Sequence, residues 1–297
     1  MLTLTTLGQQ DPTFSHSMFN QMAVNPAYAG SDDMICATAI NRQQWVGFGD
    51  GAPNTTVVNI NAAISPFGLN SGIGLNILND QFGFNNDLGV DLSYAVRFDL
   101  EGIGKLALGL NGGFINNSLD PTWNFPEGSG DAAVPQATES AINFDFGAGV
   151  FFNNEEMYFG LSATHLNESQ YYNEYTTHYK RHFYLTGGYF LNMPNESWQF
   201  NPSVFIATDL VTNQLSLTAN VIYNKKFWGG VTYRVGEAVV GMVGLELFSG
   251  MRVGYAYDYS TSDIGGYNGG SHEFMLGYCF TLKREQTPQQ YKSIRFL

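Results

Sequence analysis

The sequence predicts an all-β fold: a single transmembrane antiparallel β-barrel of about fourteen strands, with long extracellular loops and short periplasmic turns. Three observations support this class. Apolar and polar side chains alternate along much of the chain, the composition suits strands better than helices, and the long connections follow a regular order. Together they favour a wall that meets lipid on its outside and water on its inside.

Composition narrows the choice of fold. Aromatic residues make up 15% of the chain, charged residues only 13%, and there are 34 glycines. This mixture suits pleated strands and tight turns. No apolar run approaches the roughly 20 residues that a membrane-spanning helix needs. If the chain crosses a bilayer, it must do so as a closed sheet, because an open edge would leave backbone groups unpaired in hydrocarbon.

Alternation is clearest in two runs, 238–248 and 251–260. In the second run Val253 shares one face with other apolar side chains, whereas Arg252 and Asp258 take the opposite face. A period of two places successive side chains on opposite sides of a strand. One face of each run can therefore contact lipid while the other faces a polar lumen.

The same pattern recurs at 87–98 and 142–152, and its polar face supplies a predicted lumen network. Leu92 and Val96 share the apolar face of the first of these runs. Charged side chains opposite them would form ion pairs that stabilise a plugged barrel or set the selectivity of a pore. Acid–base catalysis is the less favoured interpretation, because no nucleophile–base motif accompanies them. The residues assigned to the lumen network are Asp91, Arg97, Asp145, Glu246, Arg252 and Asp258.

In chain order, the predicted strands cover 33–42, 55–64, 72–79, 87–98, 103–114, 142–152, 156–165, 181–191, 198–208, 215–224, 227–235, 238–248, 251–260 and 271–282. The even-numbered turns between them are all short. The odd-numbered connections include every long one: 43–54, 115–141, 166–180 and 261–270. Outer-membrane barrels sort their connections in this way, whereas a sandwich or propeller has no reason to do so.

No internal repeat or linker divides the barrel region, so one barrel domain is expected. Residues 1–8 are interpreted as the remnant of an export signal, with a disordered N-terminus as the alternative. We expect a periplasmic N-terminal segment at 9–32, the outer-membrane barrel at 33–283 and a periplasmic C-terminal tail at 284–297. Within the first of these, Phe14, Met18, Phe19 and Met22 fall near helical spacing, which would allow a short stretch to pack against or inside the base of the barrel.

Two of the long connections hold candidate partner-binding residues. Arg42 stands near Trp45 and Phe48 in a Gly-rich stretch, which is the composition of a contact surface. The alternative is that these aromatic residues belong to the girdle at the membrane interface. The residues assigned to partner binding are Arg42, Trp45, Gly47, Phe48, Pro53 and Trp123.

Charge and histidine content exclude other classes of function. The formal net charge of -13 argues against nucleic acid as a partner, because phosphate binding needs a basic surface. We expect no cofactor and no metal. His178 and His182 have a spacing that suits a metal on a helix, but they lead into a strand, where residues four apart lie about 13 Å from each other.

The two cysteines fall at opposite ends of the barrel sequence. Cys36 lies in the first predicted strand and Cys279 in the last, and barrel closure makes these strands neighbours. A disulfide across the seam is the less favoured of the two alternatives, since it needs Cα atoms within about 7 Å and the facing of Cys36 is ambiguous.

Stretches at both ends of the chain resemble the PorP/SprF family. They are QQDPTFS at 9–15, MFN at 18–20, NPAYAG at 25–30, RQQWVGFGDGAP at 42–53, GSHEFMLGY at 270–278 and RFL at 295–297. The resemblance covers residues 9–297, with its weak stretch in the middle. It implies a non-enzymatic outer-membrane component of the type IX secretion system of Bacteroidota.

That resemblance also implies the partners. They are a secreted cell-surface protein such as a gliding adhesin, and periplasmic and outer-membrane components of the secretion machine, with the barrel embedded in the lipid bilayer. The alternative function is an outer-membrane diffusion pore or hydrophobic-solute transporter, which conductance in a planar bilayer would distinguish from a plugged scaffold.

Overall fold

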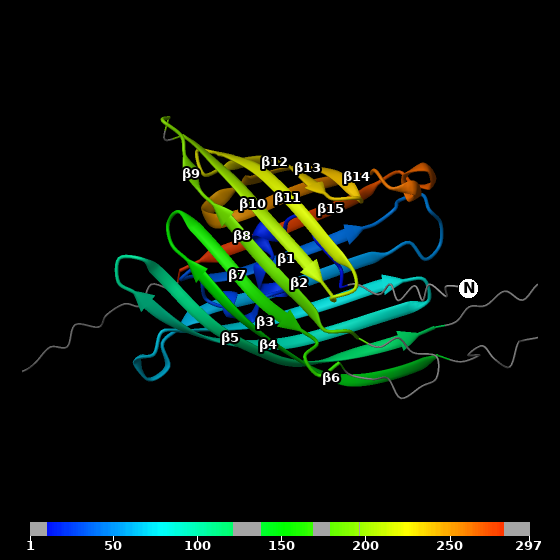
Figure 1. Cartoon of the computed structure of the whole chain (residues 1–297), viewed down its shortest axis with the longest axis horizontal. Helices are drawn as coiled ribbons and strands as arrows, with labels where there is room; N and C mark the ends of the chain where they lie inside the picture. Colours follow the sequence, from blue (N-terminus) through cyan, green and yellow to red (C-terminus); the bar gives the residue numbers. More distant parts are fainter. Residues whose placement is uncertain (1–10, 121–137, 169–178, 196, 282–297) are drawn as a thin grey trace, which may run out of the picture.

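The computed structural model describes residues 11–120, 138–168, 179–195 and 197–281. Antiparallel strands form one continuous sheet that closes on itself (Figure 1). The strands are β1 Ile35–Gln43, β2 Asn54–Ile64, β3 Ser71–Phe82, β4 Asn85–Leu100, β5 Gly104–Leu119, β6 Glu139–Asn153, β7 Met157–Thr164, β8 His182–Tyr189, β9 Leu191–Asn192, β10 Trp198–Thr208, β11 Asn213–Tyr223, β12 Phe227–Arg234, β13 Ala238–Glu246, β14 Met251–Ser260 and β15 Ser271–Phe280.

The ring has fourteen strand positions, because β8 and β9 occupy one position on either side of Phe190 and both pair with β10. It closes through the pairing of β1 with β15. The predicted fold class is confirmed. The predicted ranges 198–208 and 251–260 coincide with β10 and β14.

Connections of different length gather at opposite ends of the barrel. The connections 44–53 and 261–270 lie at one end, here called the long-loop end, together with the described residues 165–168 and 179–181 of the connection between β7 and β8 (Figure 1). The turns 101–103 and 224–226 lie at the other, here called the short-turn end. The predicted sorting of connections is therefore present in the structure.

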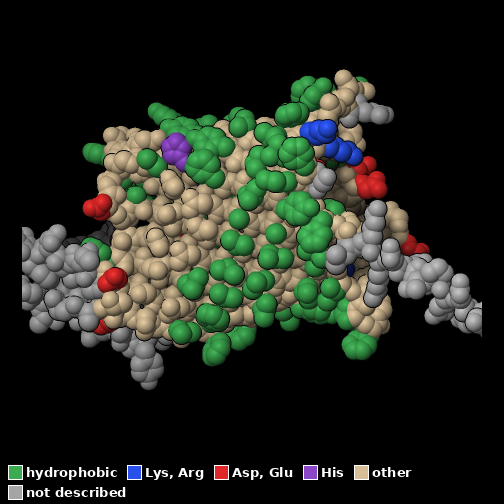
Figure 2. Space-filling model, turned by 180° about the vertical axis from the view of Figure 1, so that it is seen from behind, with side chains coloured by type: hydrophobic (Ala, Val, Ile, Leu, Met, Phe, Trp, Pro, Cys, Tyr) green, Lys and Arg blue, Asp and Glu red, His purple; other side chains and the backbone are tan. Residues whose placement is uncertain are grey.

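The outer face of the wall carries the apolar half of each alternating strand. Leu92 is 66% exposed and Phe144 is 73% exposed. Figure 2 shows hydrophobic side chains spread over the flank of the barrel, with acidic and basic side chains at its ends. Val96 and Val253 also lie in the wall and are half-buried. Such a surface would be unstable in water but suits the hydrocarbon region of a membrane. Among the described residues, no helix combines the length and apolarity needed for crossing a membrane.

A disulfide joins Cys36 in β1 to Cys279 in β15. The two residues are direct cross-strand partners, and their Cα atoms lie 4.1 Å apart. The sequence analysis favoured two unpaired cysteines over a disulfide across the seam, and that preference was wrong. The sequence could place the two strands side by side, but it could not supply the register that sets the cysteines opposite each other.

The N-terminal segment, residues 11–34, lies inside the lumen (dark blue in Figure 1). It contains three short 3₁₀ turns, η1 Ser17–Phe19, η2 Gln21–Ala23 and η3 Pro26–Tyr28. Asn25 caps η3 by accepting a hydrogen bond from the Ala27 N–H at 3.0 Å. We expected a periplasmic segment over 9–32, and its described part instead lies within the barrel.

Two glycines of the wall make room for this segment. A Cβ at Gly72 would collide with the carbonyl oxygen of Ala29, and one at Gly109 would collide with the backbone of Ala27. Both alanines are fully buried. The backbone of the segment therefore packs directly against the backbone of β3 and β5, which only glycine allows.

The apolar part of the lumen packs around the same segment. Ile40, Val57, Trp228 and Met275 from the wall form one buried cluster, and Phe14 and Phe19 of the segment pack against it. A tilted aromatic contact joins Phe19 to Trp228, with ring centroids 5.0 Å apart. The barrel core is thus formed jointly by the wall and by the residues that precede β1.

Candidate functional site

Buried charged side chains of the wall bind the N-terminal segment in the half of the lumen near the long-loop end. The Glu273 carboxylate accepts hydrogen bonds from the backbone N–H of Ser15 at 2.7 Å and from that of His16 at 2.8 Å. The His16 ring nitrogen Nδ1 lies 2.7 Å from the same carboxylate. All three residues are buried. Alternation explains the placement of Glu273, because it shares the lumen face of β15 with Ser271 and Met275.

Two arginines complete this cluster through Asp258. Arg42 Nη2 lies 2.7 Å from Asp258 Oδ2, and Arg234 Nη1 lies 3.0 Å from the same oxygen. Arg42 also donates to the carbonyl oxygen of Thr13 at 2.7 Å, and Ser15 donates to Asp258 at 2.9 Å. Buried charges of this kind are strongly destabilising once one partner is removed. The cluster therefore fixes the position of residues 13–16 in the lumen.

A second ionic contact holds the other end of the segment near the short-turn end. Asp33 lies 2.7 Å from Arg97 and 2.6 Å from Lys105. Partial burial by itself would raise the pKa of Asp33, but hydrogen bonds from Lys105 and Arg97 outweigh it and lower that pKa below its ordinary value of 3.8. The segment is thus attached by charges at both ends and runs from the long-loop end to the short-turn end.

Hydrogen bonds to amide side chains and backbone oxygens hold the middle of the segment. They are Asn59 to Asn20 at 2.7 Å, Asn25 to Val150 O at 3.0 Å, Ser162 to Val24 O at 2.7 Å and Gly30 N–H to Asn61 at 3.1 Å. The partners come from β2, β6 and β7. The segment therefore contacts opposite parts of the wall and fills the ring between them.

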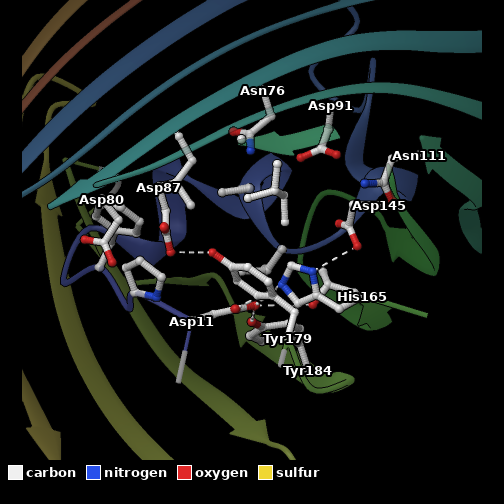
Figure 3. Close-up of a pocket in the computed structure, with 18 residues that line it drawn as sticks. Asp11, Asn76, Asp80, Asp87, Asp91, Asn111, Asp145, His165, Tyr179 and Tyr184 are labelled. Atoms are coloured by element: carbon white, nitrogen blue, oxygen red, sulfur yellow. Dashed lines mark hydrogen bonds and ion pairs between the residues drawn. The ribbon is translucent and has the colours of Figure 1, made fainter. Parts of the chain in front are cut away.

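A cavity of about 90 Å³ remains beside the segment (Figure 3). Its charged lining is almost entirely acidic. The lining groups that can carry charge are Asp11, Asp80, Asp87, Asp91, Asp145, His165, Tyr179 and Tyr184. Asp80 and Asp87 are direct cross-strand partners of β3 and β4, so their carboxylates come from neighbouring positions of the wall.

His165 connects the segment to this acidic cavity. Its Nδ1 lies 3.0 Å from Asp145 and its Nε2 lies 3.0 Å from Asp11. Burial by itself would lower the pKa of His165, but the two carboxylates outweigh burial and raise that pKa well above its usual range. For Asp11, burial would raise the pKa, and the attraction of His165 lowers it instead. Tyr184 also donates to Asp11 at 2.5 Å.

A second, larger cavity of about 590 Å³ lies at the long-loop end. Its floor is formed by residues 11–13 of the segment. Its side is formed by the β1–β2 connection, which contributes Trp45, Phe48 and Pro53. Trp45 and Phe48 contact each other with ring centroids 6.2 Å apart, and Phe48 is 52% exposed.

A third cavity, also about 590 Å³, lies at the short-turn end between the segment and the wall. Aromatic and charged side chains line it together. Among them are Tyr28, Asp32, Phe151, Tyr158, Trp228 and Arg252. The segment thus separates two open cavities at opposite ends of the barrel.

The candidate partner-binding residues do not form one surface. Trp45, Phe48 and Pro53 line the same cavity, and Gly47 is exposed within the same connection. Arg42 is only 2% exposed and is bound to Asp258 inside the lumen, so it is not available to an outside partner. Strand alternation continues through Arg42, which places it on the lumen face of β1. Trp123 lies outside the described residues.

The six predicted lumen residues all lie on the inner side, but they belong to separate clusters rather than one network. Asp258 belongs to the arginine cluster, Arg97 binds Asp33, and Asp145 binds His165. Arg252 and Glu246 pair with each other at 3.3 Å beside the cavity at the short-turn end. Asp91 lines the acidic cavity. The N-terminal segment lies between these clusters, which is why they do not join.

Several residues that carry the site were missed from the sequence. Arg234 and Glu273 lie on the polar face of alternating strands and could have been assigned to the lumen on that signal. Asp11, His16 and Asp33 belong to a segment without strand periodicity, and their partners lie far away in sequence. No local pattern identifies them.

Comparison with solved structures finds outer-membrane proteins and a transporter. The toluene transporter TbuX of Ralstonia pickettii matches with a TM-score of 0.50 at 9% identity, over 88% of this chain and 93% of that one. The outer membrane protein Omp33 of Acinetobacter baumannii matches with a TM-score of 0.49 at 7% identity, over 84% and 99%. A FadL homologue of Pseudomonas aeruginosa matches with a TM-score of 0.48 at 11% identity, over 92% and 95%. At these identities the likeness to TbuX shows the fold alone. No curated protein sequence matches the chain.

A family model described as type IX secretion system membrane protein PorP/SprF matches residues 6–278. This range contains the N-terminal segment and nearly the whole barrel wall. The family and the closed barrel fold together place the protein in the bacterial outer membrane. The chain belongs to the PorP/SprF family of type IX secretion system membrane proteins.

Proposed function

We propose that the protein is a non-enzymatic component of the type IX secretion system that supports secretion or surface attachment of a large cell-surface protein, such as a gliding adhesin. The observation that carries this proposal is the filled lumen. Residues 11–34 occupy it and are attached by ion pairs at both ends, Asp11 with His165 and Asp33 with Arg97. A barrel whose interior is occupied by its own chain can present surfaces at its two ends to partner proteins.

The buried charges favour a permanently filled barrel over an open pore. Withdrawal of the segment would leave Glu273, Arg42 and Asp258 without several of their hydrogen bonds in the lumen. Each such loss opposes withdrawal, because an unpaired buried charge is costly. A diffusion pore would need this segment to leave.

The cavity at the long-loop end is the candidate contact for the secreted protein. In outer-membrane barrels the longer loops face the outside of the cell. Trp45 and Phe48 border this cavity, and aromatic side chains beside a pocket commonly dominate binding energies. The acidic residues that line this cavity, among them Asp80 and Glu237, would favour a client segment with basic side chains.

The cavity at the short-turn end is the candidate contact for periplasmic components of the secretion machine. It combines aromatic walls, including Tyr28 and Trp228, with the charged Asp32 and Arg252. Mixed aromatic and charged linings are typical of protein interfaces. The same aromatic lining favours the second candidate, a transporter for a hydrophobic solute, which would also need a path past the segment.

Copurification and conductance test the proposal together. Less of the secreted protein should copurify from native membranes with the variant Trp45→Ala/Phe48→Ala than with the wild type. The matched control is Trp198→Ala, which removes an exposed tryptophan at the short-turn end. Folding of each variant is followed by the heat-dependent shift of the barrel in electrophoresis. Steady, large open-channel currents from the wild-type protein in a planar bilayer would contradict the proposal and favour the pore.

A further inference from the structure

We propose that Asp11, His165 and His182 together bind one divalent transition-metal ion, for which Zn²⁺ is the best candidate. This site goes beyond the proposed function and does not depend on it. Asp11 belongs to the N-terminal segment, His165 follows β7, and His182 begins β8. A metal held by these three residues would join the segment directly to the barrel wall.

The spacing of the donor atoms fits a metal site. One ligand atom from each of the three residues lies within 4.8 Å of the other two. His165 Nε2 lies 3.0 Å from Asp11, and His182 Nδ1 lies 3.8 Å from Asp11. Ligands at 2.0–2.1 Å from a tetrahedral ion are separated by about 3.3 Å, so the distance from His165 Nε2 to Asp11 is close to the required value.

Both imidazoles are oriented by a second hydrogen bond. His165 Nδ1 is 3.0 Å from the Asp145 carboxylate, which leaves Nε2 facing Asp11. His182 Nδ1 donates to the carbonyl oxygen of Lys180 at 3.0 Å. Carboxylates and backbone carbonyls hold metal-binding histidines in this way, because they fix the ring and the position of its proton.

His182 supplies an independent indication of a ligand. Its side chain is only 3% exposed, and its Nε2 has no hydrogen-bond partner in the described structure. A buried polar nitrogen without a partner is unfavourable. Coordination of a metal by Nε2 of this residue would remove that cost while Nδ1 keeps its bond to the Lys180 carbonyl, and the nearby Asp11 carboxylate provides a further donor.

The charge of the surroundings favours a dication. Among the described residues, five carboxylates line the adjoining cavity, from Asp11, Asp80, Asp87, Asp91 and Asp145, and His165 is the one lining side chain there that can carry a positive charge. Asp11 also lines the open cavity at the long-loop end, so an ion can reach the site from that side. Two imidazoles and a carboxylate select Zn²⁺ or another late first-row ion over Ca²⁺ or Mg²⁺, which prefer oxygen donors alone.

Metal titration of the purified full-length barrel tests the site. The protein, in detergent and with any purification tag removed, is treated with chelator, dialysed and titrated with Zn²⁺ by calorimetry. We expect one Zn²⁺ per chain. Co²⁺ should give the visible absorption of a tetrahedral site with nitrogen and oxygen ligands. Binding of Zn²⁺ should also protect the N-terminal segment from added protease.

Two variants and one control separate this site from adventitious binding. His182→Gln should weaken Zn²⁺ binding at least tenfold, and Asp145→Asn, which keeps all three ligands, should weaken it about 10–100-fold. His272→Gln is the control, because His272 pairs with Tyr255 away from the site and should bind as the wild type does. Absence of stoichiometric binding, or equal binding by His182→Gln and His272→Gln, would overturn the proposal and leave a plain ion pair between Asp11 and His165.

Discussion

His16 and Glu273 are joined twice inside the barrel. The backbone N–H of His16 donates to Glu273 Oε1 at 2.8 Å, and the ring nitrogen Nδ1 lies 2.7 Å from the same oxygen. These residues stand 257 positions apart in the sequence. The contact therefore connects the segment before the first strand to the last strand of the wall.

Neutralising Glu273 should destabilise the folded barrel. Glu273→Gln leaves Arg42 and Arg234 with Asp258 as their remaining buried counter-ion and removes the charged partner of His16. We expect a loss of roughly 3–5 kcal/mol, as for other broken buried ion pairs. The temperature at which the barrel loses its heat-dependent shift in electrophoresis measures the effect. Glu101→Gln, in the exposed turn 101–103, is the control, and equal melting of the two variants would contradict the prediction.

Filling the space at Gly109 should displace the N-terminal segment. The Cβ of Gly109→Ala would collide with the backbone of Ala27, and overpacking of this kind costs about 1–3 kcal/mol. The segment should then become sensitive to protease while the barrel wall still forms. Gly89→Ala is the matched control, because its Cβ would meet its nearest neighbour at 3.8 Å. A segment that stays protected in Gly109→Ala would show that the wall can yield at this point.

Acid should loosen the segment at the short-turn end. The pKa of Asp33 is lowered below 3.8 in the folded protein, since Lys105 and Arg97 bind its charged form. A lowered pKa gives stability that is present above 3.8 and is lost as the pH falls through the folded pKa. Protease sensitivity of the segment should therefore rise below about pH 4 in the wild type. Asp33→Asn has no carboxylate to protonate at this position, so its protease sensitivity should not show the same rise below about pH 4. The same dependence of protease sensitivity on pH in both proteins would contradict a role for Asp33 in holding the segment.

Loss of the disulfide should weaken the seam without opening the sheet. Cys36 and Cys279 are linked across β1 and β15, whose backbone ladder remains when the bond is removed. For Cys36→Ser/Cys279→Ser we expect a destabilisation of about 2–5 kcal/mol. The denatured wild-type protein should migrate faster without reductant than with it, whereas the double variant should show one mobility under both conditions. Free thiols in the oxidised wild type would refute the bond.

The wall was predictable because each strand carries its own signal. Side chains alternate between lipid and lumen, so β10 and β14 could be located to the residue. The same signal assigned Leu92 to the outside and Asp258 to the inside. Arg42 shows where a different signal misled. Its neighbours Trp45 and Phe48 suggested a surface, whereas its position on β1 turns it inward.

The interior was not predictable from local patterns. The N-terminal segment has no regular period, and its three turns are stabilised by partners from many strands. The pairing of Cys36 with Cys279 depends on a register that no single strand specifies. Such features become visible only when residues distant in sequence are placed together.

The occupied interior links the two ends of the chain. Residues 11–34 precede β1, yet they pass through the ring that β1 and β15 complete. Glu273, which binds the start of this segment, lies in β15 itself. Strand β15 therefore supplies both the edge that pairs with β1 to close the barrel and the Glu273 carboxylate that binds the N-terminal segment. Closure of the wall and attachment of residues 15 and 16 thus depend on one and the same strand.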